Sequence, residues 1–313
     1  SKKNMQNTNH ILLVKPAHFT FNKETAGSNA FQNLLNEKEE FIKQKVLLEF
    51  ENFASTLRSK GVQVTVVEDT PMPVKPDAVF PNNWASFHED GTIVLYPMFA
   101  PNRRLERRQD IIDLLKKDFI VTSVIDLSRF ESENKFLEGT GSIVFDHLHK
   151  TAYACLSPRT DKDLFIETCR QLNYKPVYFI ADDAQGKQIY HTNVMMCIAE
   201  KFAVICLASI TDKKEKEAVI KALTDSGHEL VDISFEQMNK FAGNMLEIKD
   251  KQEKKMLAMS KSAYDSLTPD QRKQIEKSCE LLPLPIHTIE TIGGGSARCM
   301  MAEVYLKPRS GKL

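Results

Sequence analysis

Five short passages of the 313-residue chain carry residues that could do chemistry, and these passages are almost evenly spaced. Each contains Gly, Asn or an acid and leads into an apolar run typical of a strand. The marker residues are Asp77, Glu138, His191, Asn244 and Cys299, which stand 61, 53, 53 and 55 residues apart. A repeat of this length can hold a hairpin, a helix and a further strand. Five such units could close into a ring whose marker residues meet at one axis.

These residue types together suit attack on a planar, nitrogen-rich carbon. Cysteine attacks as a thiolate that a nearby histidine can generate, so Cys299 and His191 form a natural pair. A carboxylate beside the imidazole would orient it, a role that fits Glu138. Asp77 could hold the N–H groups of a guanidinium or ureido group in line with sulfur. Taken singly, each residue also has a structural explanation, as a packed histidine or as an acid in a turn.

The glycine-rich passage before Cys299, IGGGSARCMMAEVYLKP, invites comparison with a phosphate-binding loop. It has no Lys-Ser/Thr pair after its glycines, and the next element is predicted to be a strand rather than a helix. The chain also has no GxSxG or GxGxxG motif, which argues against an α/β hydrolase or a dehydrogenase. We therefore expect the glycines to adopt positive φ and to let the backbone approach a planar ligand closely.

The remaining cysteines are expected to be structural. The six cysteines contain no CxxC pair and no Cys/His spacing typical of zinc, so the site residues predict no metal. Cys197 and Cys206 lie in apolar runs, where cysteine usually behaves as a small buried hydrophobe. Cys299 is the one expected to be reactive, and the chemistry described for it requires no cofactor.

The elements that must position these residues alternate between strand and helix. Residues 11–19 and 62–69 are predicted strands, and residues 30–60 keep helical spacing up to Gly61. The polar residues 20–29 between them are a predicted loop that could close over the site as a lid. Further along, apolar hairpin-like pairs alternate with charged helices; one such pair, residues 193–210, breaks at Glu200 and Lys201. The chain therefore reads as mixed α/β, with one domain over residues 10–310 and a disordered N-terminus over residues 1–9.

Composition limits the classes of partner. Hydrophobic residues make up 42% of the chain, enough for a sizeable core. Lys plus Arg equals Asp plus Glu at 42 each, so no net field attracts nucleic acid or an anionic membrane. No apolar run approaches the roughly 18 residues of a membrane span. We expect a cytoplasmic protein that binds a small molecule, with a homodimer as one option for its assembly.

The marker residues resemble those of the guanidino-group-modifying amidinotransferase superfamily, the five-bladed pentein enzymes. Members place a substrate-binding Asp early, a Glu near a Gly-rich passage, a His in the middle and a nucleophilic Cys near the C-terminus. The resemblance implies an α/β propeller of five ββαβ repeats with pseudo-fivefold symmetry. PNRRLE (101–106) and CLSPRTD (155–161) also resemble dimethylargininase passages. In that family their arginines grip the substrate's α-carboxylate, which implies this role for Arg103 and Arg159.

Departures from the family pattern point to the substrate. Dimethylargininases carry an acidic pair where this chain has Asn82 and Asn83, and deiminases commonly carry Asp where it has Asn193. Amides suit a neutral ureido group, whose carbonyl oxygen needs a donor. Four of the passages, PDAVFPNNW, EGTGS, FAGNMLE and GGGSARCMMAE, resemble the citrulline-hydrolysing branch, which implies conversion of citrulline to ornithine, carbon dioxide and ammonia.

Other functions stay open from the sequence. An arginine deiminase or a dimethylargininase, acting on a cationic guanidinium, is the main alternative. A non-catalytic pentein binding protein, like the ribosomal anti-association factor, is a distant one. The role of Asn244 and the order in which the products leave are not fixed by the pattern.

Overall fold

A computed structural model describes residues 5–33 and 38–310. Within them lie five three-stranded sheets, β15-β1-β2, β3-β4-β5, β6-β7-β8, β9-β10-β11 and β12-β13-β14. In every sheet the first strand runs antiparallel to the second, and the second runs parallel to the third. Because parallel neighbours need a crossover, helices lie between the second and third strands. The expected α/β class and fivefold repeat of one unit are confirmed.

The strands are β1 His10–Lys15, β2 Gln63–Glu68, β3 Ala85–Phe87, β4 Thr92–Leu95, β5 Ser123–Asp126, β6 Val144–Asp146, β7 Thr151–Cys155, β8 Lys175–Phe179, β9 Met196–Ile198, β10 Phe202–Ile205, β11 Glu229–Asp232, β12 Leu246–Lys249, β13 Lys255–Ser260, β14 Glu280–Leu284 and β15 Ala302–Glu303. The helices are α1 Glu39–Ser59, α2 Pro101–Arg104, α3 Gln109–Asp118, α4 Gly139–Ser142, α5 Lys162–Leu172, α6 Lys213–Asp225, α7 Phe235–Asn239, α8 Lys261–Ser266, α9 Pro269–Glu276, α10 His287–Gly293 and α11 Ala297–Met300.

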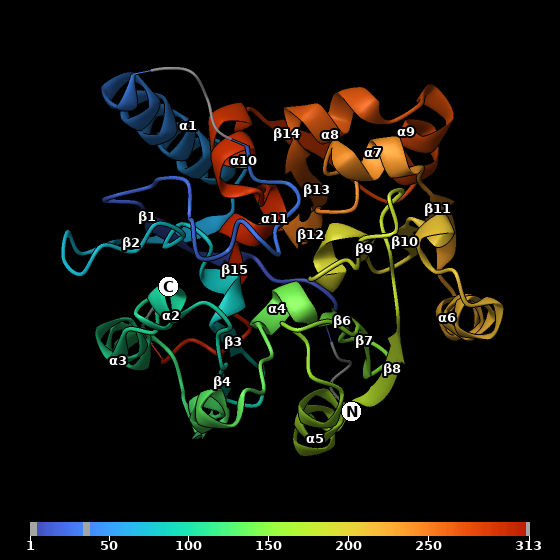
Figure 1. The fold of residues 1–313 in the computed structure, drawn as a ribbon, viewed down its shortest axis with the longest axis horizontal. Coiled ribbons are helices and arrows are strands. Elements are labelled where there is room, and N and C mark those ends of the chain that lie inside the picture. Colours follow the sequence, from blue (N-terminus) through green and yellow to red (C-terminus); the bar gives the residue numbers. More distant parts are fainter. Residues whose placement is uncertain (1–4, 34–37, 311–313) are drawn as a thin grey trace.

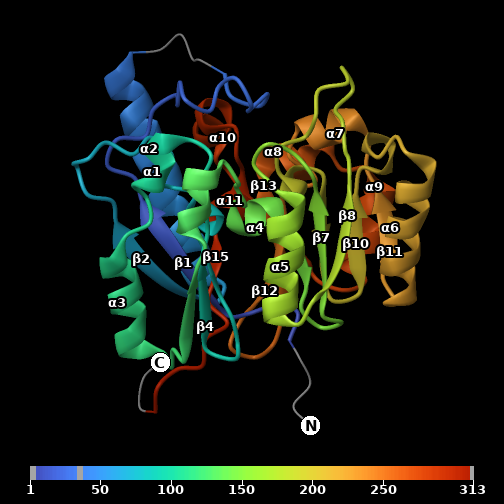
Figure 2. The same ribbon diagram turned by 60° about the horizontal axis from the view of Figure 1, so that its bottom comes forward.

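The long helices lie on the outside of the sheets. Figure 1 shows α1, α3, α5, α6 and α9 at the periphery and the short helices α4 and α11 near the centre. Figure 2, turned by 60°, shows α3, α5 and α6 standing outside their strands. Helix α1 buries Val46, Phe50, Phe53 and Leu57, a stripe at helical spacing that faces the core. The chain thus carries its apolar faces inward and leaves the central turns to position polar groups.

The first sheet contains strands from both ends of the chain. β15 pairs antiparallel with β1, with Leu12 opposite Ala302, and β1 pairs parallel with β2. A further parallel bridge joins Phe87 in β3 to Val304, just after β15. The C-terminal segment therefore links the first sheet to its neighbour.

Short helical turns precede four of the five first strands. They are Pro81–Asn83, α4, Thr192–Val194 and α11, and the first strands that follow span only two or three residues. The predicted strand after Cys299 is therefore wrong in its start, because Cys299 lies within α11. The predicted break at Glu200 and Lys201 is confirmed as the turn between β9 and β10. Cys299 lies within one of these turns, and Glu138 and His191 directly precede two others.

The predicted helix over residues 30–60 begins later than expected. α1 starts at Glu39, while residues 34–37 lie outside the described residues. The Asn29 side chain accepts the Phe31 N–H at 3.0 Å, and the Phe31 ring packs against Tyr190 and Phe241. Local side-chain bonding and aromatic packing therefore replace helix at the start of this segment.

The expected disorder of residues 1–9 does not extend to residues 6–8. Gln6 Nε2 donates to the Phe145 carbonyl at 3.0 Å, Asn7 Nδ2 donates to Glu247 Oε1 at 2.7 Å, and Thr8 Oγ1 donates to the Val304 carbonyl at 3.0 Å. These side chains are buried. Residues 1–4 lie outside the described residues. Among the described helices, none is long and apolar enough to cross a membrane.

Candidate active site

The five marker residues lie in or beside the turns that precede the first strands, and these turns contact one another. α4 contacts both Pro81–Asn83 and Thr192–Val194, and α11 contacts Pro81–Asn83. The side chains of all five marker residues are buried. The near-even spacing in sequence thus corresponds to turns that meet in space, and Figure 1 shows two of them, α4 and α11, near the centre of the molecule.

Glu138 and His191 form a hydrogen-bonded pair. His191 Nε2 lies 2.6 Å from Glu138 Oε1, while Oε2 accepts the Phe99 N–H at 2.9 Å. Burial would raise the pKa of Glu138, but the charge of Arg159 and the bond from His191 lower it to about 2. Burial lowers the pKa of His191 to about 4, and Glu138 offsets part of that effect. A carboxylate only accepts hydrogen bonds, so Nε2 carries the proton and Nδ1 offers a lone pair.

Two amide groups approach the sulfur of Cys299. Asn244 Nδ2 lies 3.3 Å from Sγ, and Asn193 Nδ2 lies 3.5 Å from it. Asn244 Nδ2 also donates to the backbone carbonyl of Asn193 at 2.9 Å, which fixes the orientation of the Asn244 amide. N–H donors aimed at sulfur stabilise negative charge there. The surroundings of Cys299 therefore suit a nucleophilic thiolate.

The Arg103 guanidinium is bonded to protein groups on several sides. Its Nε and Nη2 donate to the two carboxylate oxygens of Glu106, each at 2.9 Å. Nη1 donates to Asn83 Oδ1 at 2.7 Å, Nη2 donates to the Phe80 carbonyl at 3.2 Å, and Nε lies 3.9 Å from Asp77 Oδ2. Glu106 already occupies the edge that a substrate carboxylate would pair with bidentately. This geometry counts against the carboxylate-gripping role expected of Arg103.

Arg159 is held more loosely. Its Nε lies 3.1 Å from Ser28 Oγ, which Nη2 also contacts, and Nη2 lies 3.5 Å from the Thr25 carbonyl. Nη1 is 3.5 Å from Glu138 Oε1, longer than a charge-assisted hydrogen bond normally is. The guanidinium lies over the Tyr190 ring at 4.4 Å. Arg159 thus keeps its charge buried without a bidentate carboxylate partner among the described residues.

Residues 20–33 place polar groups on the site. Asn22 Nδ2 donates to Asp77 Oδ2 at 2.9 Å, and Asn29 Nδ2 donates to the Gly293 carbonyl at 3.2 Å. Burial raises the pKa of Asp77, and the charge of Arg103 offsets part of that effect. The segment therefore touches the groups that the sequence assigned to substrate, consistent with the position of a lid.

Several buried polar atoms around the site have no hydrogen-bond partner within the described residues. They are Asp77 Oδ1, Asn82 Oδ1 and Nδ2, Asn83 Nδ2, Asn193 Oδ1 and Asn244 Oδ1. A buried group left unpaired costs about 1–3 kcal/mol. Such a concentration in one place is what a polar ligand site requires, and it includes both donors and acceptors.

Glycines allow the turns to approach one another. A Cβ on Gly141 would lie 2.5 Å from Asn83 Nδ2 and 2.9 Å from His191 Nδ1, so any larger residue would push these groups apart. Gly294 has φ +68°, as the sequence predicted for its loop, and a Cβ there would meet the Asn29 side chain at 2.6 Å. The close approach at the triple glycine is therefore to other parts of the protein, including residues 20–33.

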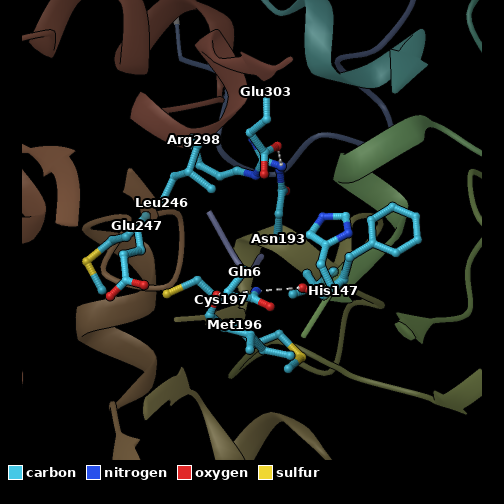
Figure 3. A pocket seen from close by; sticks show the side chains of 13 residues that line it. Gln6, His147, Asn193, Met196, Cys197, Leu246, Glu247, Arg298 and Glu303 are labelled. Carbon is cyan, nitrogen blue, oxygen red and sulfur yellow. Dashed lines mark hydrogen bonds and ion pairs between the residues drawn. The ribbon is translucent and has the colours of Figure 1, made fainter. Parts of the chain in front are cut away.

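A cavity of about 30 Å³ borders the site at Asn193 (Figure 3). Arg298, Glu303, Glu247 and Gln6 also line it, and Arg298 and Glu303 form an ion pair. This volume suffices for a few water molecules but not for an amino acid. The cavity as it stands is therefore too small to hold the substrate.

Sequence reasoning missed the residues that support the marker residues. Glu106 lies within PNRRLE, where the resemblance drew attention to the arginines, and Tyr190 directly precedes His191. Asn22 and Ser28 belong to the polar stretch expected to be a lid, but nothing in the pattern assigned them to Asp77 and Arg159. Their contacts join residues more than 50 positions apart, which single-sequence spacing does not reveal.

The fold is shared with solved structures of low sequence identity. One is the N-terminal domain of ArgZ, an arginine dihydrolase from the ornithine–ammonia cycle in cyanobacteria, solved as a cysteine-to-serine mutant bound to substrate: 16% identity, 94% of this chain and 97% of that chain covered, TM-score 0.73. Another is unliganded AgrE: 16% identity, 97% of this chain and 40% of that chain covered, TM-score 0.73. This chain thus spans about two fifths of AgrE.

A third similar structure is a histidine-to-glycine variant of dimethylarginine dimethylaminohydrolase, as an adduct with S-methyl-L-thiocitrulline: 14% identity, 96% of this chain and 100% of that chain covered, TM-score 0.64. No curated protein matches the sequence. The family of eukaryotic N,N dimethylarginine dimethylhydrolases, however, matches residues 15–306, nearly the whole chain. The chain therefore belongs to this family, within the pentein superfamily of cysteine-dependent hydrolases that act on non-peptide C–N bonds.

Proposed function

We propose that the protein hydrolyses a ureido substrate, citrulline, to ornithine, carbon dioxide and ammonia through a covalent adduct on Cys299. The observation that carries this proposal is the orientation of the Asn83 amide. Arg103 donates to Asn83 Oδ1 at 2.7 Å, and a guanidinium has no acceptor. Asn83 Nδ2 therefore has to face the other way, toward the Gly141 and His191 side, where it has no partner among the described residues.

A fixed, unpaired donor discriminates between the two kinds of substrate. A ureido group has a carbonyl oxygen that can accept from Asn83 Nδ2, whereas a guanidinium carries only donors. Placing a guanidinium there would leave the amide donor unpaired at a cost of about 1–3 kcal/mol. The unpaired acceptor Asp77 Oδ1 would then take the ureido N–H groups. Donor and acceptor together favour the neutral planar group.

The mechanism follows from the bonds around Cys299 and His191. The thiolate, facing the amides of Asn193 and Asn244, attacks the ureido carbon, and the oxygen takes up negative charge near Asn83 Nδ2. His191 Nδ1 takes the proton that Cys299 gives up in forming the thiolate, and then passes this proton to the departing nitrogen, which leaves a thiocarbamate on sulfur. Nδ1 then removes a proton from water, which attacks the adduct and releases the sulfur with a carbamic acid. The carbamic acid loses carbon dioxide and gives the second amine product. Glu138 holds the imidazole and stabilises its charged form.

Arg159 is the proposed partner of the substrate's α-carboxylate. Its fork is held by Ser28 and Thr25 of residues 20–33, at distances up to 3.5 Å, and a carboxylate could replace these neutral groups. Asn22 on Asp77 would be displaced in the same movement. Residues 20–33 then act as a lid that opens for substrate entry. For Arg103 we propose a positioning role, through Asn83, in place of carboxylate binding.

We also propose how the five units are arranged and where the protein works. The five units would close into a propeller with pseudo-fivefold symmetry, forming a single domain over residues 10–310 that works in the cytoplasm, alone or as a homodimer. The shared connectivity of the five sheets and the Phe87–Val304 bridge support the closed ring. Asn82 is buried and both its amide atoms lack a partner among the described residues, so we propose it as a further substrate contact.

Hydrolysis of arginine or of a methylated arginine is the second candidate. Two buried carboxylates, Asp77 and Glu138, lie in the site, and paired acids suit a cationic guanidinium. The family name and the substrate-bound domain of ArgZ, an arginine dihydrolase, motivate the same substrates. In this case the pair of acids, rather than the Asn83 donor, would decide binding.

The deciding experiment is a substrate screen with citrulline, arginine and N,N-dimethylarginine, scored by ammonia, ornithine and citrulline released. We expect ornithine from citrulline, with kcat/KM at least about 10-fold above that for either guanidine, as one unpaired donor predicts. Faster turnover of arginine or dimethylarginine would refute the ureido proposal. Cys299→Ala should lower kcat by about 10⁴-fold or more while the circular dichroism spectrum is kept. Retained activity in Cys299→Ala would exclude the nucleophile.

A further inference from the structure

Three potential metal ligands meet at the end of the sheets away from Cys299. Asp146 ends β6, His149 lies in the turn before β7, and His228 directly precedes β11. One ligand atom from each lies within 4.8 Å of the other two. α4, which follows Glu138, precedes β6, so Asp146 sits at the opposite end of that strand from the site. The cluster therefore plays no part in the proposed reaction.

Asp146 and His149 already share the geometry of neighbouring ligands. His149 Nδ1 lies 3.0 Å from Asp146 Oδ2 and 3.1 Å from Oδ1, and the His149 N–H donates to Oδ1 at 3.0 Å. The Asp146 carboxylate is fully buried, while His149 is exposed. An ion could therefore reach the buried carboxylate from solvent along the imidazole. Donor atoms 3.0 Å apart fit two ligands that bind one ion at about 2.0–2.2 Å.

His228 comes from the neighbouring sheet and is buried. Its Nδ1 lies 3.1 Å from the Leu223 carbonyl, and its Nε2 lies 3.1 Å from the Ala199 carbonyl. A neutral imidazole has one N–H and can donate to only one of these oxygens. With the proton on Nδ1, the Nε2 lone pair faces a carbonyl oxygen, a repulsion that a cation beside Nε2 relieves. A ring N–H held by a backbone carbonyl is also the usual arrangement of a metal-binding histidine.

We propose that Asp146, His149 and His228 bind a divalent transition-metal ion, such as Zn²⁺. Two imidazole nitrogens and one carboxylate oxygen are a donor set that suits zinc, cobalt or nickel, with water in a remaining position. The ion would tie the β6–β7 turn to the loop before β11 and so join two neighbouring sheets. Spacing along the sequence hides this set, because 79 positions separate His149 from His228. Its role is structural.

The test uses the Cys299→Ala variant, because a catalytic thiolate would itself bind zinc. Isothermal titration of this metal-free variant with Zn²⁺ should give one site per chain and a higher unfolding temperature with zinc present. Adding His149→Ala should weaken binding at least about 10-fold and remove the thermal shift. His149 is exposed, so this variant should fold. His287→Ala, an exposed histidine on α10, is the matched control and should bind zinc as Cys299→Ala does.

Further variants separate the site from nonspecific binding. Asp146→Asn and His228→Gln should also lose the thermal shift, and Co²⁺ should give an absorption spectrum without a sulfur charge-transfer band. Unchanged zinc affinity in His149→Ala, equal loss in His287→Ala, or sulfur ligation of cobalt would overturn the proposal. So would a Cys299→Ala protein that binds no zinc. None of these readouts depends on turnover, so they stand apart from the proposed function.

Discussion

Two buried arginines flank the candidate site, and they are held in opposite ways. Arg103 has its fork filled by Glu106 and its remaining side bonded to Asn83. Among the described residues, the N–H groups of Arg159 meet Ser28, Thr25 and one oxygen of Glu138, with two of these contacts at 3.5 Å. The two side chains are equally buried, at 3% and 2% exposed, so burial does not distinguish them. The two arginines differ instead in how completely their N–H groups are hydrogen-bonded.

Comparing the two arginines distinguishes a structural residue from a candidate ligand-binding residue. A bidentate pair such as Arg103–Glu106 is geometrically complete and gains little from a ligand. In the proposed function, an arginine that meets neutral groups of a lid would instead exchange them for a carboxylate when substrate enters. We therefore propose different roles for two arginines that look equivalent in sequence. The same contrast predicts which substitutions affect stability and which affect catalysis.

The largest effect is expected at Glu138, which contacts both Arg159 and His191. Glu138→Gln should lower kcat by about 10⁴-fold, because the amide no longer stabilises the imidazolium and does not fix the His191 tautomer. Steady-state kinetics with citrulline would measure this loss. Glu167→Gln, an exposed acid on α5, is the control and should keep full activity. A Glu138→Gln loss below about 10-fold would show that the pair does not act in proton transfer.

Removing the Arg103 guanidinium should instead destabilise the fold. Arg103→Met leaves Glu106 buried without its partner and should lower the free energy of unfolding by about 3–5 kcal/mol. Arg103→Met combined with Glu106→Leu should recover most of that loss in denaturant titrations. The double variant should still discriminate poorly between citrulline and arginine, because Asn83 is no longer oriented.

A stable Arg103→Met variant would contradict the structural role proposed for Arg103. If Arg103→Met is as stable as the parent protein and only its KM rises, then Arg103 binds the substrate carboxylate, as the family resemblance implies.

The sequence predicted the repeat and the polar groups better than it predicted their bonding. The markers Glu138, His191 and Cys299 could be identified because their residue types restrict the chemistry, and the units could be counted because their spacing is even. The helical turn that contains Cys299 was missed, since the four residues ARCM are too few to show helical periodicity. The late start of α1 was missed for another reason. Phe31 packs against Tyr190 and Phe241, and such tertiary contacts override local helical spacing.

The roles of the arginines show a limit of motif reasoning. PNRRLE and CLSPRTD gave Arg103 and Arg159 the same role, because a motif does not specify which acid is near. Glu106 is only three residues from Arg103, a spacing that favours an ion pair on a helical turn. That signal was present in the sequence. The contact of Arg159 with Ser28, across 131 positions, was not.

Arg159→Lys should have a moderate effect confined to binding. Lysine keeps the positive charge near Glu138 but loses the planar fork, so KM for citrulline should rise about 10- to 100-fold with little change in kcat. Stability should change by less than about 1 kcal/mol, in contrast to Arg103→Met. An alkyl urea that lacks the α-carboxylate is the matched control, since parent and variant should turn it over equally. A variant that loses activity equally on the alkyl urea would place the role of Arg159 at the reacting carbon instead.

The smallest effect is expected from a change of pH. It tests whether residues 20–33 keep water away from His191 and Arg159 in solution. The pKa of His191 falls from 6.5 to about 4 because burial disfavours the imidazolium. A pKa lower in the folded state stabilises the fold above pH 6.5, and this contribution is lost as pH falls through about 4. Activity should follow the same group, because protonation removes the lone pair on Nδ1. Between pH 7 and pH 5.5 kcat/KM should therefore fall less than about twofold from this cause, with a steep decline only near pH 4. An acid limb centred near pH 6.5, with the fold intact by circular dichroism, would mean that His191 is hydrated in the working enzyme. In that case residues 20–33 would stand open in solution, and the Arg159 fork would be exposed before substrate arrives.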